Sequence, residues 1–342
     1  MPSTTTNGKV IFNEKISSGY PVPGKTVVYD ESEQLDLSSV PLDGGFLVKT
    51  IVLSVDPYMR GLMSESPDVT GFALGSPTAS YGIGRVLRSE SPQLKTGDHV
   101  YGFLSHEQYS VHPSSSSLRK IEKSPELSWS TYLGAAGMPG LTAYSAWKEY
   151  ALSTGKGLVA FVTAASGPVG SMVVQLAKAD GYKVIASAGS DDKVEFTKKC
   201  GADVAFNYKT TSTADVLKEH GPIDLYWDNV GGQILETALA HANMCARFIE
   251  CGMISSYNGE SYGPKNLQLL YTKHITMYGF TVVNLEDKYR DDFLRTIPPK
   301  LVSGELQHME YLLHGLDKVG EGILAVQKGV NRGKAVVVVA EE

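Results

Sequence analysis

The apolar positions follow two different patterns along the chain. Up to about residue 130, short runs of alternating apolar and polar residues are separated by turns, most clearly at 45–55 and 80–88. Such alternation is typical of strands with one buried face. Because no long helical period interrupts these runs, the pattern predicts a β-rich domain made of short strands.

From about residue 133 the pattern becomes an alternation of strands and helices. Residues 158–165 form a continuous apolar run, which is typical of a parallel strand buried on both faces. Further strands are predicted at 183–189, 204–208, 223–227, 247–251 and 277–280, with helices at 167–180 and 191–200. This alternation predicts an α/β fold with a doubly wound parallel sheet.

The last apolar run, residues 333–340, has no helix after it. We expect it to return to the first domain and complete its sheet. The β-rich domain would then be discontinuous, comprising residues 1–132 and 310–342, with a nucleotide-binding domain at 133–309 inserted between its parts. A chain of 342 residues suits two domains of this kind.

Composition narrows the classes of function. The net charge is −6 and no long basic run occurs, so nothing indicates nucleic-acid binding. The three cysteines, Cys200, Cys245 and Cys251, lack paired spacing, which suits a reducing compartment better than a disulfide framework. No stretch approaches the roughly 20 apolar residues of a membrane span, and no signal core stands at the N-terminus. We therefore expect a cytosolic protein.

A glycine motif follows the first buried strand and opens the predicted helix at 167–180. It comprises Ala165, Gly167, Val169 and Gly170 within the sequence ASGPVG. The dinucleotide fingerprint G-x-G-x-x-G has this context, here with alanine at the first glycine. Gly167 would let the backbone approach a pyrophosphate, which the free N–H groups of the helix N-terminus would bind. Glycine is also common in ordinary turns, so the prediction of a dinucleotide site depends on the strand before the motif and the helix after it.

The end of the second strand distinguishes NAD from NADP. An NAD site has an acidic residue there that binds the ribose 2′-hydroxyl. This strand instead ends at Gly189 and Ser190, and Lys193 follows within one helical turn. A lysine there either pairs with a 2′-phosphate or is an ordinary surface lysine. Asp191 and Asp192 complicate the choice, unless they face solvent in the first turn of the helix.

Nearly the whole chain resembles the zinc-independent medium-chain dehydrogenases/reductases. More narrowly, it is similar to the prostaglandin reductase/leukotriene B4 12-hydroxydehydrogenase and plant alkenal double-bond reductase family. Besides the glycine motif, the matching stretches are DPYMRG (56–61), GAAGMPGLTAY (134–144), AGSDDKV (188–194), FNYK (206–209), DNVGG (228–232) and CGMISSYN (251–258). The resemblance implies a Rossmann domain with a GroES-like β-rich domain, NADPH as cofactor, and a homodimer.

The resemblance also implies roles for individual residues. Lys193 and Tyr208 would hold the 2′-phosphate, and Asn229 would line the cofactor site. The remaining cofactor contacts would come from Cys251, Tyr257, Phe280, Val282 and Asn331. Tyr58 and Tyr81 would line the substrate pocket, although Tyr81 fits a core or surface position equally well.

A zinc site is not expected. Three scattered cysteines cannot form a four-cysteine structural site. His106 and Glu107 lack the preceding glycine of a catalytic zinc motif, and no cysteine occurs before Cys200. We interpret His106 and Glu107 as exposed polar residues, and His99 as structural.

Without a metal, a hydroxyl donor must stabilise the charge that forms on the substrate. The hypothesis is that NADPH reduces the carbon–carbon double bond of an α,β-unsaturated aldehyde or ketone, with hydride added at the β carbon. The resemblance places Tyr257 as the donor to the resulting oxyanion. The alternative is that this tyrosine only packs against the cofactor. A quinone reductase, a secondary-alcohol dehydrogenase and a non-catalytic NADPH-binding protein remain alternatives on the same scaffold.

Overall fold

The computed structural model describes residues 4–65, 70–151 and 155–341. Its contacts divide the chain into two compact units. Unit 1 comprises Met1–Leu133 and Glu310–Glu342, and unit 2 comprises Gly134–Met309. No helix in the described part of the chain has the length and apolar character that crossing a membrane requires.

Unit 2 is built on a parallel sheet, as the alternating pattern predicted. Its described residues form six strands in the order β12-β11-β10-β13-β14-β15. The strands are β10 (Val159–Val162), β11 (Lys183–Ala188), β12 (Val204–Asn207), β13 (Ile223–Asp228), β14 (Ala242–Glu250) and β15 (Thr276–Gly279). All neighbouring pairs are parallel. The order reverses between β10 and β13, and ligands of such sheets bind at the carboxyl ends of the strands beside that point.

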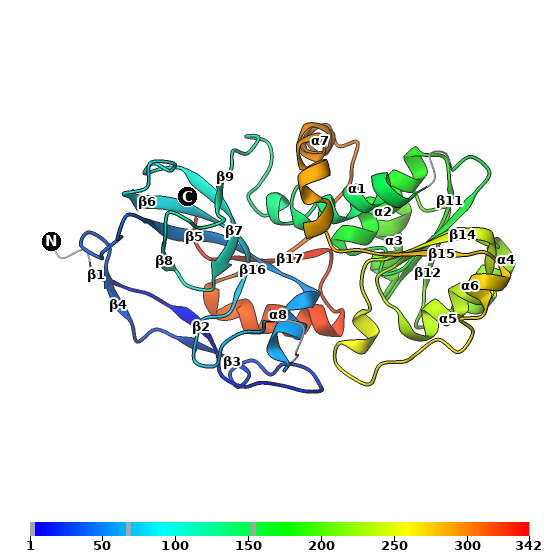
Figure 1. The fold of residues 1–342 in the computed structure, drawn as a ribbon, viewed down its shortest axis with the longest axis horizontal. Helices are drawn as coiled ribbons and strands as arrows, with labels where there is room; N and C mark the ends of the chain where they lie inside the picture. The colour runs from blue at the N-terminus through cyan, green and yellow to red at the C-terminus, as the bar shows by residue number, and fades with distance from the viewer. Residues whose placement is uncertain (1–3, 66–69, 152–154, 342) are drawn as a thin grey trace. The chain divides into compact units, whose positions relative to one another are not determined.

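Helices cover both faces of this sheet (Figure 1). The helices are α1 (Met138–Tyr150), α2 (Pro168–Ala179), α3 (Asp191–Lys199), α4 (Thr213–His220), α5 (Gly232–Ala240), α6 (Leu269–Thr272) and α7 (Val283–Val302). Helix α1 packs against both α2 and α7, whereas α4 packs against α5. The sheet core between these layers is fully buried at Phe161, Ile185, Tyr226 and Phe248. The predicted Rossmann-type fold is confirmed.

Unit 1 contains a mixed sheet. The described residues form seven strands, with the order β16-β17-β5-β6-β7-β9 and with β8 also paired to β5. These strands are β5 (Phe46–Val55), β6 (Ala79–Ser89), β7 (His99–Ser105), β8 (Tyr109–His112), β9 (Arg119–Lys120), β16 (Glu310–His314) and β17 (Lys334–Val338). The smaller ladders are β1 (Thr4–Thr6) with β4 (Gln34–Asp36), and β2 (Lys9–Phe12) with β3 (Val27–Asp30).

Short helices complete unit 1. They are η1 (Pro57–Met63), η2 (Thr131–Leu133), η4 (Leu316–Lys318) and α8 (Val319–Lys328), and η3 (Ile254–Ser256) is the corresponding short element of unit 2. The C-terminal strand does return to this unit, because β17 pairs antiparallel with β5. A buried ion pair joins β17 to the residue that follows β5: the Lys334 ammonium lies 2.5 Å from the Asp56 carboxylate and donates to the Val55 carbonyl at 2.9 Å.

The interpretation of His106 and Glu107 as exposed residues is wrong. His106 is fully buried, and its two ring nitrogens lie 2.7 Å from the Thr78 hydroxyl and 2.9 Å from the Ser80 hydroxyl. Burial lowers the pKa of His106 to about 3, so its ring is neutral. Glu107 forms an ion pair with Lys9 at 2.9 Å.

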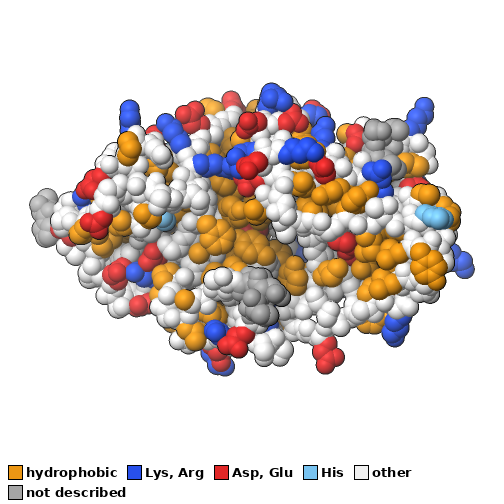
Figure 2. Space-filling model, in the orientation of Figure 1, with side chains coloured by type: hydrophobic (Ala, Val, Ile, Leu, Met, Phe, Trp, Pro, Cys, Tyr) orange, Lys and Arg blue, Asp and Glu red, His pale blue; other side chains and the backbone are white. Residues whose placement is uncertain are grey.

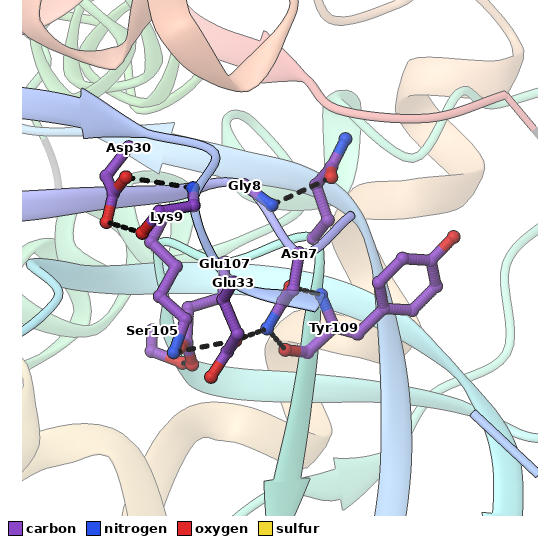
Figure 3. Close-up of polar contacts among 10 residues, drawn as sticks. Asn7, Gly8, Lys9, Asp30, Glu33, Ser105, Glu107 and Tyr109 are labelled. Carbon is purple, nitrogen blue, oxygen red and sulfur yellow. Dashed lines mark hydrogen bonds and ion pairs between the residues drawn. The ribbon is translucent and has the colours of Figure 1, made fainter. Parts of the chain in front are cut away.

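The same lysine connects the N-terminal strands to the sheet. Figure 3 shows Lys9 between Glu107 and Glu33, which it also contacts at 2.9 Å. Beside it, the Asn7 amide donates to the carboxylate of Glu33 at 2.6 Å and accepts from the Tyr109 N–H at 2.9 Å. His106 and Glu107 are therefore structural residues of unit 1.

Candidate cofactor and active site

The loop between β10 and α2 has the compact geometry of a dinucleotide-binding turn. Ala164 adopts a left-handed φ of 47°, so the tight turn falls one residue before the position aligned with the first glycine. The N–H of Ala165 donates to the Ser187 carbonyl at 2.9 Å, which ties the loop to β11. A Cβ on Gly170 would lie 2.5 Å from the Ala164 oxygen, so the helix packs on the loop too closely for any side chain.

Gly167 caps α2 with extended backbone, and its surroundings are open. A Cβ there would meet only the Ala164 oxygen, at 3.2 Å. A side chain at this position would therefore point into unfilled space in front of the helix N-terminus, where free N–H groups bind anions. Pro168 and Val169 form the first turn, where a proline costs no hydrogen bond. These features fit a pyrophosphate.

The predicted 2′-phosphate residues lie together after β11. A Cβ on Gly189 would lie 3.0 Å from the Tyr208 hydroxyl, so the phenol lies directly against the glycine backbone. Ser190 caps α3, and the Lys193 side chain is buried in the first turn of that helix. Tyr208 itself is 49% exposed. Ser190 and Lys193 follow Gly189 along the chain and Tyr208 lies against it, so the residues near this stretch of backbone include a hydroxyl, an ammonium and a phenol, groups that can bind a phosphate.

Both acidic residues of this turn accept hydrogen bonds from neighbouring side chains, and the partner of Asp192 is Ser190 itself. The Asp191 carboxylate accepts a hydrogen bond from the Asn207 amide at 2.9 Å, and the Asp192 carboxylate accepts one from the Ser190 hydroxyl at 2.6 Å. Both side chains are exposed at the N-terminus of α3, where negative charge complements the helix dipole.

Asn229 follows β13 at the order reversal and is rigidly held. Its side-chain amide donates to the Thr163 carbonyl at 2.6 Å and accepts from the Trp227 indole at 3.2 Å. Its backbone N–H donates to the Thr163 hydroxyl at 2.9 Å. Thr163 thus joins the loops after β10 and β13. Sequence reasoning missed it, because a threonine at the end of an apolar strand carries no distinctive signal.

The loop after β14 carries Cys251 and Tyr257. Burial raises the pKa of the Cys251 thiol to about 12, with the nearby carboxyl groups of Asp228 and Glu250 adding to the effect, so the group is a thiol and not a thiolate. A Cβ on Gly252 would lie 3.4 Å from the Tyr257 hydroxyl, which therefore lies over the backbone of its own loop. Burial also raises the pKa of Tyr257, which keeps it protonated and able to donate.

Phe280 and Val282 lie where β15 gives way to α7. The Phe280 ring packs edge-on against Trp227, with centroids 5.9 Å apart, and lies 6.0 Å from Tyr150. Val282 is half-buried and caps α7. All the predicted unit 2 residues thus lie in loops at the carboxyl ends of the strands or in the first turns that follow.

Three predicted residues belong to unit 1. Tyr58 on η1 and Tyr81 on β6 both pack against Phe103, with ring centroids 6.5 and 5.5 Å from it. Phe103, which the sequence did not single out, is 43% exposed. Asn331 precedes β17, and its amide donates to the Gly333 carbonyl at 2.8 Å.

Among the residues described, no group of three or more His, Cys, Asp or Glu side chains could hold a metal ion. Two family models match the chain. The model "Zinc-binding dehydrogenase" matches residues 168–297, and the model "N-terminal domain of oxidoreductase" matches residues 27–121.

Individual relatives indicate the type of reductase more specifically than the family models do. The chain is 39% identical to the NADP(+)-dependent 2-alkenal reductase of Nicotiana tabacum, over 100% of both chains. It is 36% identical to prostaglandin reductase 1 of Bos taurus, over 91% of this chain and 95% of the relative. It belongs to the zinc-independent medium-chain dehydrogenases/reductases. Within this family it lies with the alkenal and prostaglandin reductases, as its motifs predicted.

A solved structure shows the similarity in three dimensions. The structure of CurA from Vibrio vulnificus in complex with NADPH matches with a TM-score of 0.87 and 27% identity, over 98% of this chain and 100% of CurA. The fold that this chain shares with CurA therefore includes both units.

Proposed function

We propose that this medium-chain reductase uses NADPH to reduce the carbon–carbon double bond of α,β-unsaturated aldehydes and ketones. The observation that carries the proposal is the match to a 2-alkenal reductase at 39% identity over the whole chain. The chain is an NADP-dependent oxidoreductase, as its named relatives are. The precise substrate and the residue roles below are parts of the proposal.

The cofactor would bind along the carboxyl edge of the unit 2 sheet. Its pyrophosphate would lie at Gly167 and the N-terminus of α2, and its 2′-phosphate between Ser190, Lys193 and Tyr208. The open space at Gly167 and the close packing of Tyr208 on Gly189 support this placement. When bound, NADPH supplies the hydride. Asn229, Cys251, Phe280, Val282 and Asn331 would complete the contacts to it.

Tyr257 would supply the electrophilic assistance. Hydride addition to the β carbon moves negative charge onto the carbonyl oxygen of the substrate, and a phenol placed there stabilises that charge by donating a hydrogen bond. Burial raises the pKa of Tyr257 above its ordinary value, so the phenol is protonated at neutral pH and able to donate. The aromatic side chains of Tyr58, Tyr81 and Phe103 would form an apolar wall that favours enones with hydrophobic tails.

Replacement of Tyr257 by Phe tests this assignment. The variant removes one hydroxyl and keeps the ring, so NADPH affinity measured by fluorescence titration should change little. Loss of one oxyanion donor costs roughly 10²–10³-fold in kcat. Full turnover of an enone by Tyr257→Phe would remove the phenol from the mechanism.

The rival chemistries have less support. The matching quinone oxidoreductases of Pseudomonas syringae, Escherichia coli and Coxiella burnetii are 18–20% identical to the chain, which indicates a shared fold alone. Product analysis after incubation with NADPH and an enone, a quinone or a ketone separates a double-bond reductase from a quinone reductase and an alcohol dehydrogenase. Tight NADPH binding without turnover of any of them would favour a non-catalytic role.

We also propose a homodimer. In the order of the described strands, β15 is an edge strand of the unit 2 sheet, and such an edge can pair with a second copy. Figure 2 shows apolar side chains exposed over the end of unit 2 that carries α5 and α6, where Leu267 and Tyr271 are 48% and 73% exposed. Light scattering during size-exclusion chromatography tests the dimer. A cytosolic location remains a prediction from the sequence.

A further inference from the structure

Two adjacent strands at the centre of the unit 2 sheet end in carboxyl side chains. Asp228 is the last residue of β13 and Glu250 the last of β14, and the parallel register pairs them. Residues paired in this way lie on the same face of a sheet, so the backbone holds the two carboxyl groups side by side. One step earlier, Tyr226 pairs with Phe248, and their rings pack edge-on at 5.1 Å. The acid pair therefore rests on an aromatic layer.

The hydrogen bonds of this pair are incomplete. One oxygen of Asp228, Oδ1, accepts from the Tyr226 hydroxyl at 2.9 Å and from the N–H groups of Val230 and Gly231 at 2.7 and 2.8 Å. The other oxygen, and both oxygens of Glu250, are buried and receive no hydrogen bond from a donor in residues 4–65, 70–151 and 155–341. An ionised carboxylate can only accept hydrogen bonds, so two ionised groups here would leave three buried oxygens without a donor.

The surroundings offer no compensating charge. The titratable groups that face the pair are the Tyr226 phenol from β13 and the Cys251 thiol from the loop after β14, and the Thr163 hydroxyl approaches from the loop after β10. No basic side chain in the described residues forms an ion pair with either carboxyl group. Burial, followed by the charge of Asp228, raises the pKa of Glu250 to about 9, and burial raises the pKa of Asp228. One proton placed between the two groups joins two of these three oxygens in one hydrogen bond, for which the described surroundings offer no other donor.

We propose that Asp228 and Glu250 share one proton at neutral pH and, as a hydrogen-bonded acid pair, act as positioning residues for the cofactor site. The role in positioning rests on the proposed function, whereas the shared proton does not. The main chain of Asp228 accepts from the N–H groups of Cys251 and Gly252 at 2.9 and 3.1 Å. Beyond it, the Ser255 hydroxyl donates to the Val230 carbonyl at 2.6 Å.

The pair therefore lies at the junction of two loops, one carrying Asn229 and the other carrying Tyr257. Loss of the shared proton would place two like charges in contact at this junction, because no basic group is there to offset them. Separation of the two strand ends would follow, and with it displacement of both loops. Cofactor affinity should then fall as the folded pair ionises, near pH 9.

Folding stability changes over a different and wider pH range. The folded pair keeps its proton up to about pH 9, whereas an unfolded glutamate loses its proton near its ordinary pKa of about 4.3. Between these values the folded state holds one proton more than the unfolded state, so a rise in pH favours unfolding. The unfolding constant should increase by up to about tenfold per pH unit from this pair alone.

Urea unfolding of the cofactor-free protein between pH 6 and pH 9 tests the shared proton. The variant Glu250→Gln can donate to Asp228 without ionising, so its unfolding constant should lack this contribution. The ratio of the wild-type constant to that of the variant should rise with pH. The matched control is Glu219→Gln, whose side chain is 75% exposed on α4 and which should follow the wild type. If the unfolding constants of the wild type and of Glu250→Gln depend equally on pH, the proposal is overturned.

Two further measurements keep the test decisive. If Glu250→Gln does not fold, infrared spectroscopy of the wild-type protein tests the shared proton instead. The C=O band of a protonated carboxyl group should be present at pH 7 and disappear above pH 9. Absence of this band at pH 7 would overturn the proposal. NADPH titration at pH 7 and pH 10 then tests positioning, because affinity should fall in wild type and hold in Glu250→Gln. No NADPH binding at either pH would refute the proposed function and leave the unfolding result intact.

Discussion

Replacement of Gly170 by Ala should test the packing role of the glycine motif. A Cβ at this position would lie 2.5 Å from the Ala164 oxygen and 2.7 Å from the Ala165 Cα. Both atoms belong to the backbone of the tight turn, and neither can rotate away. The helix must therefore shift outward from β10, or the left-handed turn at Ala164 must open.

The size of the effect follows from this clash. Inserting a methyl group into a packed site typically costs about 1–3 kcal/mol. For a unit of this size, each kcal/mol lowers the melting temperature by roughly 2–4 °C. We expect Gly170→Ala to melt at a clearly lower temperature in differential scanning calorimetry and to bind NADPH more weakly, because the N-terminus of α2 is displaced.

Two control variants make this result interpretable. A Cβ on Gly263 meets nothing within 4 Å, so Gly263→Ala should melt with the wild type. Gly167→Val should retain most of its stability and lose NADPH affinity, because its side chain enters the space assigned to the pyrophosphate. Wild-type melting and NADPH binding in Gly170→Ala would refute the packing argument.

Three further predictions concern charge. Lys193→Ala should weaken NADPH binding by about 10–100-fold, which is the value of a charge-assisted hydrogen bond, and should leave NADH binding unchanged. Lys199→Ala, on the exposed side of α3, is the control and should change the binding of neither cofactor. Asp56→Asn should lower the free energy of unfolding in urea by about 3–5 kcal/mol, because it leaves the buried Lys334 ammonium without its counterion. An unchanged urea midpoint would show that the ion pair does not stabilise the fold. The pKa of His106 is about 3 in the folded protein and about 6.5 in the unfolded chain, so the unfolded chain binds an extra proton between these values. The free energy of unfolding should therefore fall as the pH falls from 6.5 towards 3, and it should fall less steeply in His106→Gln.

The elements of the Rossmann sheet could be predicted because their signals are local. The continuous apolar run at 158–165 gave β10, the alternation of strands and helices gave β11 and β13 to within a few residues, and the glycine motif gave the start of α2. The return of β17 to unit 1 could also be predicted, because a final strand without a following helix has no place in the alternating pattern. The family motifs placed the candidate cofactor residues in the loops that follow these strands.

The residues that prediction missed are defined by distant partners. His106 can be buried because Ser80 on β6 and Thr78 just before that strand satisfy its two ring nitrogens. Glu250 is a charged residue at the end of an apolar strand, which in sequence indicates a surface position. Its burial depends on the register with Asp228, which no local pattern encodes. Helix α7 contains Pro298 and Pro299, residues that locally favour the end of a helix.

The destination of the hydride tests the central claim most directly. NADPH carrying deuterium at the transferred position should be incubated with an enone, and the product analysed by NMR. The account predicts a saturated ketone with deuterium on the β carbon. Deuterium on the former carbonyl carbon, in an allylic alcohol, would contradict it.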